Sequence, residues 1–316
     1  MMPRLLVTVL FFIVPACVVL EPDVPQPFEY DQESTYAENC LPFAESKDLP
    51  TPNYRQFEPF FGDHCSGTQH QSIQDIGQIL FVGDSVTRGT PPTEEWNYYA
   101  NLLYFELSQS FPELTMKNCA EWGARTDDII QPQLMRCAPM PQDTPTLIVM
   151  TVGGNDMFVA AQKLLNGESV DAANAVVDRS IQHLEEAMQW IRDEAPTRFP
   201  EGVYVVFTNV YEFTDATGDL SSCPSSELLG FDGTVPEMKT AYVHAAEQYM
   251  RVAVDSGFDL VMLMEHFCGH GFHADNPDSP CYRGPEAQNW FDGTCIHPNP
   301  QGHQEIAQLF RRLILP

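Results

Sequence analysis

Short apolar runs alternate with longer amphipathic stretches from residue 78 to the C-terminus. Most of the short runs are rich in β-branched residues, which is typical of buried strands. The apolar runs cover residues 78–82, 147–152, 203–207 and 260–263, and residues 114–118 are a further, short strand candidate. Strands that alternate with helices predict a parallel sheet covered by helices on both faces. We therefore expect an α/β fold, a three-layer α/β/α sandwich around a flavodoxin-like, five-stranded parallel sheet.

Between these runs, apolar residues recur at every third or fourth position, which predicts amphipathic helices. The longest helix is expected over residues 172–194 and should end at Pro196, because proline cannot continue the hydrogen-bond ladder. Thr126 is expected to be the N-cap of a helix over residues 126–135. Further helices are expected over residues 96–110, 236–255 and 301–313.

Residues 1–17 have the features of a secretory signal peptide. Arg4 precedes an apolar stretch at residues 5–14 that is too short to span a bilayer. The sequence Val-Pro-Ala-Cys, which ends at Cys17, is similar to a bacterial lipobox, in which the cysteine is lipidated and tethers the protein to a membrane. Plain secretion is the alternative. Either route predicts an exported protein that is extracellular, periplasmic or membrane-anchored.

Residues 18–76 are rich in proline, acidic and aromatic residues and show no steady periodicity. This composition predicts a tether followed by an irregular N-terminal wrap. The alternating strands and helices follow it, so we place one domain over residues 77–316. Two long connections, at residues 214–235 and 265–296, follow expected strands and should lie at the rim of the crevice there.

Export changes the interpretation of the cysteines. The chain has nine, and eight remain when Cys17 is set aside. An even number in an exported chain favours disulfide bonds. Nearest-neighbour pairing, the simplest scheme, would join Cys40 to Cys65 and Cys119 to Cys137.

The formal net charge of −28 and the sequence pI of about 4.4 exclude one class of partner. Nucleic-acid binding requires a basic face for the phosphates, so we expect none. A strongly acidic surface is well solvated. We expect a monomer.

Three polar segments stand where strands end or a helix begins. Gly83-Asp84-Ser85 follows the first expected strand, residues 153–156 follow the third, and residues 292–298 precede the last helix. In an open parallel sheet the C-terminal strand ends share one crevice, so Ser85 and Asn155 should meet there. Alone, Ser85 fits a helix N-cap and Asn155 fits a turn. Together with a histidine they are the parts of a serine hydrolase.

Four sequence blocks resemble those of SGNH, or GDSL-type, hydrolases. They cover residues 81–86 (FVGDSV), 118–123 (NCAEWG), 153–156 (GGND) and 292–298 (DGTCIHP) and occur in the family's order. The resemblance spans residues 79–316. It implies a serine hydrolase that cleaves ester bonds and needs neither a cofactor nor a metal.

Physical chemistry assigns the same roles to these residues. A serine hydroxyl needs a base within hydrogen-bond reach, and His297 is the candidate base for Ser85. The backbone N–H groups of Ser85 and Gly123 and the side chain of Asn155 are the candidate oxyanion hole. Loss of one such donor typically lowers the rate by about 10²–10³.

The third member of the triad has two candidates. The family often places an aspartate three residues before the histidine, but Thr294 occupies that position here. Asp292 stands two residues earlier, and a bend at Gly293 would bring its carboxylate to Nδ1 of His297. A backbone carbonyl that orients the imidazole is the alternative. We expect Asp292 to be the catalytic acid.

A second cluster contains metal-ligating residue types: His266, Cys268, His270, His273 and Asp275. Such a cluster can bind zinc. Export and the even cysteine count instead favour a disulfide at Cys268, and we expect no metal site.

The expected substrate is a small-molecule or lipid ester. Aromatic and apolar residues are candidates for an acyl groove, which favours a lipase, phospholipase or acyl esterase; they are Trp96, Met157, Phe158, Trp290 and Phe291. A carbohydrate O-acetylesterase would carry the same catalytic blocks. A catalytically silent, exported binding module is an alternative of another class, and covalent labelling of Ser85 would distinguish it.

Overall fold

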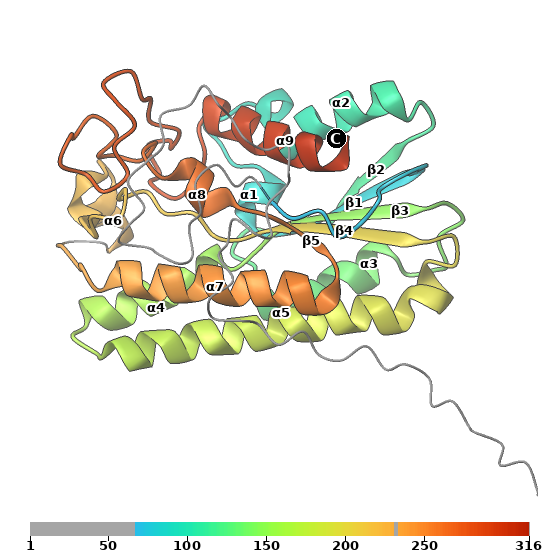
Figure 1. Cartoon of the computed structure of the whole chain (residues 1–316), viewed down its shortest axis with the longest axis horizontal. Coiled ribbons are helices and arrows are strands. Elements are labelled where there is room, and N and C mark those ends of the chain that lie inside the picture. The colour runs from blue at the N-terminus through green and yellow to red at the C-terminus, as the bar shows by residue number, and fades with distance from the viewer. Residues whose placement is uncertain (1–66, 231–232, 316) are drawn as a thin grey trace, which may run out of the picture.

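Five parallel strands form one sheet in the computed structural model, which describes residues 67–230 and 233–315 (Figure 1). The strands are β1 (Gln78–Gly83), β2 (Thr115–Asn118), β3 (Thr146–Thr151), β4 (Val203–Thr208) and β5 (Asp259–Val261). Their order in the sheet is β2-β1-β3-β4-β5, and every neighbouring pair is parallel. This is the flavodoxin-like order, so the expected fold class is confirmed.

Burial explains why the central strands are continuous apolar runs. Every residue of β3 is buried, because helices cover both faces of a parallel sheet. The edge strand β2 is polar and partly exposed. In the register of the central pair, Gln78 lies opposite Thr146 and Gly83 lies opposite Thr151. The ends of β1 and β3 are therefore level, which places the residues that follow them side by side.

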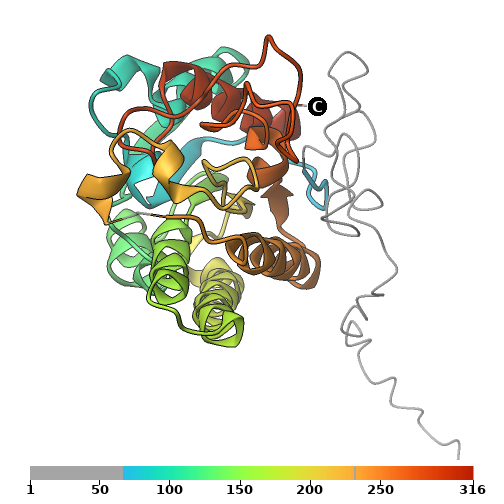
Figure 2. The same ribbon diagram turned by 90° about the vertical axis from the view of Figure 1, so that its left-hand side faces the viewer.

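Helices form the two outer layers (Figure 1). One face of the sheet carries α4 (Gly154–Leu165), α5 (Val170–Arg198) and α7 (Met238–Ser256). The opposite face carries α2 (Tyr99–Ser110) and α9 (Pro300–Ile314). The short helices α1 (Ser85–Arg88), α6 (Ser226–Leu229) and α8 (Leu263–Phe267) lie at the side of the molecule that faces the viewer in Figure 2.

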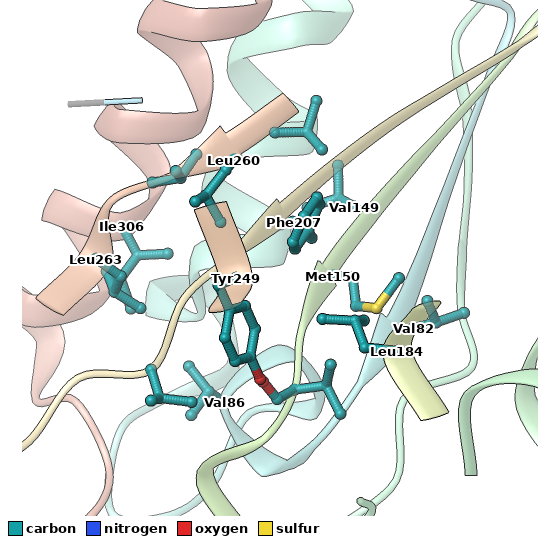
Figure 3. Packing of buried hydrophobic residues seen from close by; sticks show 14 of the residues in the cluster. Val82, Val86, Val149, Met150, Leu184, Phe207, Tyr249, Leu260, Leu263 and Ile306 are labelled. Carbon is teal, nitrogen blue, oxygen red and sulfur yellow. The ribbon is translucent and has the colours of Figure 1, made fainter. Parts of the chain in front are cut away.

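The buried core between the sheet and the helices includes Phe207, Leu184 and Tyr249 (Figure 3). The hydroxyl of Tyr249 donates a hydrogen bond to the carbonyl of Val152 (2.7 Å), which ties α7 to the end of β3. Gly153, the next residue, has a φ of +106°, and a Cβ there would lie 1.9 Å from the Tyr249 oxygen. Only glycine fits, so this contact sets the turn that leads into α4.

The expected helix over residues 126–135 is wrong. The chain instead forms a 3₁₀ turn (Thr126–Asp128), a π-helical turn (Ile129–Leu134) and the short helix α3 (Met135–Cys137). Pro132 is the cause, because it lacks an N–H group and drives the residue before it, Gln131, into an extended conformation. The N-cap of the first turn is Arg125 rather than Thr126.

Two other boundaries differ from expectation. Helix α5 continues past Pro196 to Arg198, because a proline in the last turn removes only one hydrogen bond of the ladder. The last strand is shorter than expected, and Leu263 begins α8 instead of ending β5.

Residues 67–71 pack against the sheet at β5 and β4. The backbone N–H of Thr68 donates to Leu260 O (2.9 Å), and the buried carboxylate of Asp259 accepts from Thr68 Oγ1, His70 N and Gln71 Nε2. The expected signal peptide, Cys17 and the expected Cys40–Cys65 bond lie outside the described residues. Within residues 67–230 and 233–315, no helix has the length and apolar character needed to cross a membrane.

Disulfide bonds join Cys119 to Cys137, Cys223 to Cys295 and Cys268 to Cys281. The first is the pair that nearest-neighbour pairing predicted. The scheme fails for Cys223, whose partner lies 72 residues later in the chain. The fold brings the connection after β4 next to the loop before α9, a proximity that sequence order does not reveal.

Candidate active site

Ser85 is the first residue of α1, and one residue, Asp84, separates it from the end of β1. Asp84 is the N-cap of this helix, and its Oδ1 accepts the N–H of Val86 (3.0 Å). The simple capping role that Ser85 could have had therefore falls to its neighbour. Gly83 is held by the buried Gln133, which accepts from Gly83 N (2.6 Å) and donates to Gly83 O (2.9 Å). The π-helical turn at Pro132 thus helps to fix the serine.

His297 meets Ser85 across the strand ends, with its Nε2 2.9 Å from Ser85 Oγ. The loop that carries His297 runs into α9, where Asn299 is the N-cap. Burial lowers the pKa of His297, and the Asp292 carboxylate opposes this effect. The imidazole is therefore neutral at neutral pH, the form in which it can accept a proton from the serine.

The other ring nitrogen of His297 contacts a threonine. Nδ1 lies 2.8 Å from Thr294 Oγ1, and this hydroxyl donates a hydrogen bond to Asp292 Oδ1. The backbone N–H of Thr294 also donates to Asp292 Oδ1 (2.7 Å). From the sequence we expected the Asp292 carboxylate at Nδ1, with a backbone carbonyl as the alternative. The structure places the Thr294 hydroxyl there instead. Thr294, at the position where the family often has an aspartate, therefore makes the direct contact with Nδ1 of His297.

The candidate oxyanion residues converge on the same edge of the sheet. Asn155 Nδ2 donates to the carbonyl of Ala124 (2.8 Å), the residue after Gly123. The loop that carries Gly123 is fixed beside β1, because Glu121 N donates to Gly83 O (3.0 Å). Gly123 has a φ of +75°, a conformation that favours glycine. The Asn155 amide has a second N–H, and Asn155 lines the same cavity as Ser85.

A buried chain of hydroxyl groups supports the serine turn. Thr151 Oγ1 donates to Asp84 Oδ1 (2.9 Å), and Thr87 Oγ1 lies 2.7 Å from Thr151 Oγ1 and 2.6 Å from Tyr99 OH. Burial raises the pKa of Asp84 to about 7, and the Thr151 hydrogen bond opposes this rise. The chain joins α1 to β3 and α2. The sequence analysis missed it, because threonines in a strand and a tyrosine in a helix carry no motif.

A cavity of about 710 Å³, counting the part that opens to solvent, lies beside Ser85. Its wall is mainly apolar, with contributions from α4 and from the segments after β4 and β5; it includes Val152, Phe158, Ala161, Val210, Phe213, Leu220, Met238, Tyr242 and Leu263. Leu220 and Ile296 come from the two long connections, which therefore reach the crevice as expected.

Only one of the expected acyl-groove residues, Phe158, lines this cavity. Met157 is buried in the core, and Trp290 and Phe291 pack in an aromatic cluster with Phe267. Trp96 is 68% exposed and is not part of the cavity wall. Residue type alone did not separate groove residues from core residues.

The histidines of the second cluster point to separate partners. Cys268 forms the expected disulfide, with Cys281. His266 Nε2 lies 3.4 Å from Glu305, His273 Nε2 lies 3.1 Å from Asp219, and His270 stacks on Trp290. In the described part of the chain, no three His, Cys, Asp or Glu side chains gather as a metal site would require.

Comparison with known proteins identifies the same four sequence blocks and the same fold. A sequence model of the GDSL-like Lipase/Acylhydrolase family matches residues 81–305, which include all four blocks. The structure is similar to an extracellular lipase from Streptomyces rimosus (20% sequence identity, TM-score 0.50) and to phospholipase A1 from Streptomyces albidoflavus (19% identity, TM-score 0.51). Each match covers 75% of this chain and 99% of the other chain, which shows a shared fold. A search of curated proteins finds no match.

Proposed function

This chain belongs to the GDSL-like lipase/acylhydrolase family, and we propose that it hydrolyses carboxylic esters through an acyl-enzyme on Ser85. The observation that carries the proposal is the 2.9 Å contact between Ser85 Oγ and His297 Nε2, beside an apolar cavity that Ser85 lines. A serine and a neutral histidine in this geometry are an activated nucleophile and its base.

In the proposed reaction, His297 Nε2 takes the proton of Ser85 as Oγ attacks the carbonyl carbon of the ester. The negative oxygen that forms is stabilised by the backbone N–H groups of Ser85 and Gly123 and by the Asn155 amide. His297 then gives its proton to the leaving alcohol, and water releases the acid by the same steps in reverse order. The Asp292 carboxylate stabilises the imidazolium that exists between these steps.

The cavity favours a substrate with an acyl chain rather than an acetyl group. A pocket for an acetyl group needs room for only one methyl group. Here the apolar wall that includes Ser85 continues over Phe158, Ala161 and Leu220. Burial of each additional CH₂ of a substrate against such a wall contributes about 0.8 kcal/mol. We therefore propose a lipase-, phospholipase- or acyl-esterase-like specificity, with carbohydrate O-acetylesterase activity as the competing outcome.

A chain-length series of p-nitrophenyl esters, run beside an acetylated glycan, tests this specificity. We expect kcat/KM to rise from acetate to longer acyl chains. Ala161→Phe fills the cavity and should lower kcat/KM for the longer esters about tenfold while sparing acetate. Val159→Phe, on the same helix but not in the cavity wall, is the matched control. Activity that peaks at acetate in both the wild type and the Ala161 variant would reject the acyl-chain proposal.

The disulfides also bear on where the enzyme works. Disulfide bonds form and persist in oxidising compartments and are rare in the cytosol. The bonds at Cys119, Cys223 and Cys268 are therefore consistent with export. We propose that residues 1–17 direct this export, with or without lipidation of Cys17.

A further inference from the structure

Thr294 occupies the space between the acid and the base of the proposed triad. Its Oγ1 lies 2.8 Å from His297 Nδ1 and donates to Asp292 Oδ1. We propose that Thr294 is a positioning residue whose hydroxyl relays the orienting effect of Asp292 to His297. The inference rests on the proposed roles of Ser85 and His297 and adds a fourth member to that site.

The hydrogen-bond inventory allows one assignment of the protons. A hydroxyl has one hydrogen to donate, and an ionised carboxylate can only accept. The Thr294 hydrogen therefore points to Asp292, so Oγ1 must accept at its other contact. The proton of the neutral imidazole is then on Nδ1, and Nε2 carries the lone pair that faces Ser85. This is the tautomer that a general base at Nε2 requires.

The backbone holds Thr294 in this place through several independent contacts. Thr294 N and Cys295 N donate to Asp292 Oδ1 and O, at 2.7 and 3.1 Å. Asp292 N donates to His297 O (2.9 Å), which closes the loop. Cys295 has a φ of +72° and is bonded to Cys223. The turn therefore holds the Thr294 hydroxyl between Asp292 and His297.

Among the described residues, the Asp292 carboxylate has few hydrogen-bond partners to stabilise its charge. Asp292 is 8% exposed, and its Oδ2 is buried with no hydrogen-bond partner among the described residues. Among the side chains of the described residues, only Thr294 donates a hydrogen bond to its other oxygen, Oδ1. A buried carboxylate in this state is costly unless it serves a positive charge. The imidazolium of His297, which forms during the proposed reaction, supplies that charge one hydroxyl away.

Kinetics of matched variants in the full chain provide the first test. Thr294→Val removes the hydroxyl at nearly constant shape and should lower kcat about 10- to 100-fold, with little change in KM. Thr294→Ser keeps the hydroxyl and should retain activity within about threefold. Asp292→Asn keeps an acceptor for Thr294 N and removes the charge.

The double variant Thr294→Val/Asp292→Asn should be no slower than the worse single variant, because both remove the same relay. Wild-type kcat in Thr294→Val would overturn the proposal. Independent losses that multiply in the double variant would do so too.

Nitrogen NMR of histidine-labelled protein tests the relay without any turnover. The signals of His297 are assigned by their loss in His297→Ala. In the wild type we expect the neutral ring to carry its proton on Nδ1, and in Thr294→Val a mixture of tautomers with a lower His297 pKa. His244 on α7, whose Nε2 contacts Asp178, is the internal reference, which should not change. A wild-type ring protonated on Nε2 would overturn the relay, whereas an Nδ1 tautomer in a protein without esterase activity would instead reject the proposed function.

Discussion

His303 is buried and His297 is half-buried, and their surroundings give them different roles. His303 is fully buried in α9, its Nδ1 accepts the N–H of Tyr99 (3.3 Å), and its ring stacks with that of Tyr99. Burial lowers the pKa of His303 to about 3, so it stays neutral and packs between α2 and α9. His297 instead contacts Ser85 and Thr294. Only His297 is placed to exchange a proton with the serine.

The pH dependence of kcat/KM follows from the state of His297. Its pKa is lowered by burial, and only the neutral ring can accept the Ser85 proton. Activity should therefore be present above this pKa and be lost as pH falls through it, with a midpoint below about 6.5. Because the Asp292 carboxylate raises this pKa, Asp292→Asn should move the midpoint to still lower pH. An acid limb centred above about pH 7 would contradict the assignment of the base.

At this scale the sequence predicted which residues meet but not every contact between them. Ser85, Asn155 and His297 belong to motifs whose positions at strand ends are set by the fold. The contact of Thr294 with His297 depends on the turn at Cys295, whose positive φ cannot be predicted from residue spacing. Gln133 carries no motif and was missed.

Among the elements, the loops that follow the strands carry most of the site. The connection after β4, which includes Cys223, is joined by a disulfide to the loop that holds His297. The hydroxyl of Tyr211, just after β4, donates to Ile296 O (2.9 Å) in the same loop. These two contacts fix the loop that carries the base.

Removal of this disulfide should therefore affect catalysis as well as stability. Cys223→Ala/Cys295→Ala should lower the free energy of unfolding by about 2–5 kcal/mol and lower kcat about tenfold or more in the protein that remains folded. Cys268→Ala/Cys281→Ala is the control, because that bond closes a short loop that does not include His297. We expect it to lower stability alone, as measured by urea unfolding and by esterase assays below the transition. Equal kcat in the two double variants would show that the bond does not position the base.

Element by element, the predictions succeeded where one physical signal dominates. The buried strands were identified because a doubly covered sheet requires continuous apolar runs. The helix over residues 126–135 failed because Pro132 outweighs the apolar spacing around it. The Cys223–Cys295 bond could not be predicted from the sequence, because pairing between distant segments depends on how the layers pack.

At the scale of the molecule, the described residues are built on one parallel sheet whose C-terminal strand ends lie along one edge. The order of strands places β1 beside β3, and the level ends of these two strands bring Ser85 and Asn155 to the same cavity. A fold of this kind hosts many activities, so the fold and the family alone do not choose the substrate. The shape of the cavity makes that choice in our proposal.

Covalent labelling by a fluorophosphonate probe, followed by mass spectrometry of peptides, tests the central claim that Ser85 is an activated nucleophile. We predict one adduct on Ser85 in the wild type, labelled at least about 100-fold more slowly in His297→Ala and at a near wild-type rate in folded His303→Ala. A folded wild-type protein without an adduct on Ser85, or with labelling that does not depend on His297, would contradict the account.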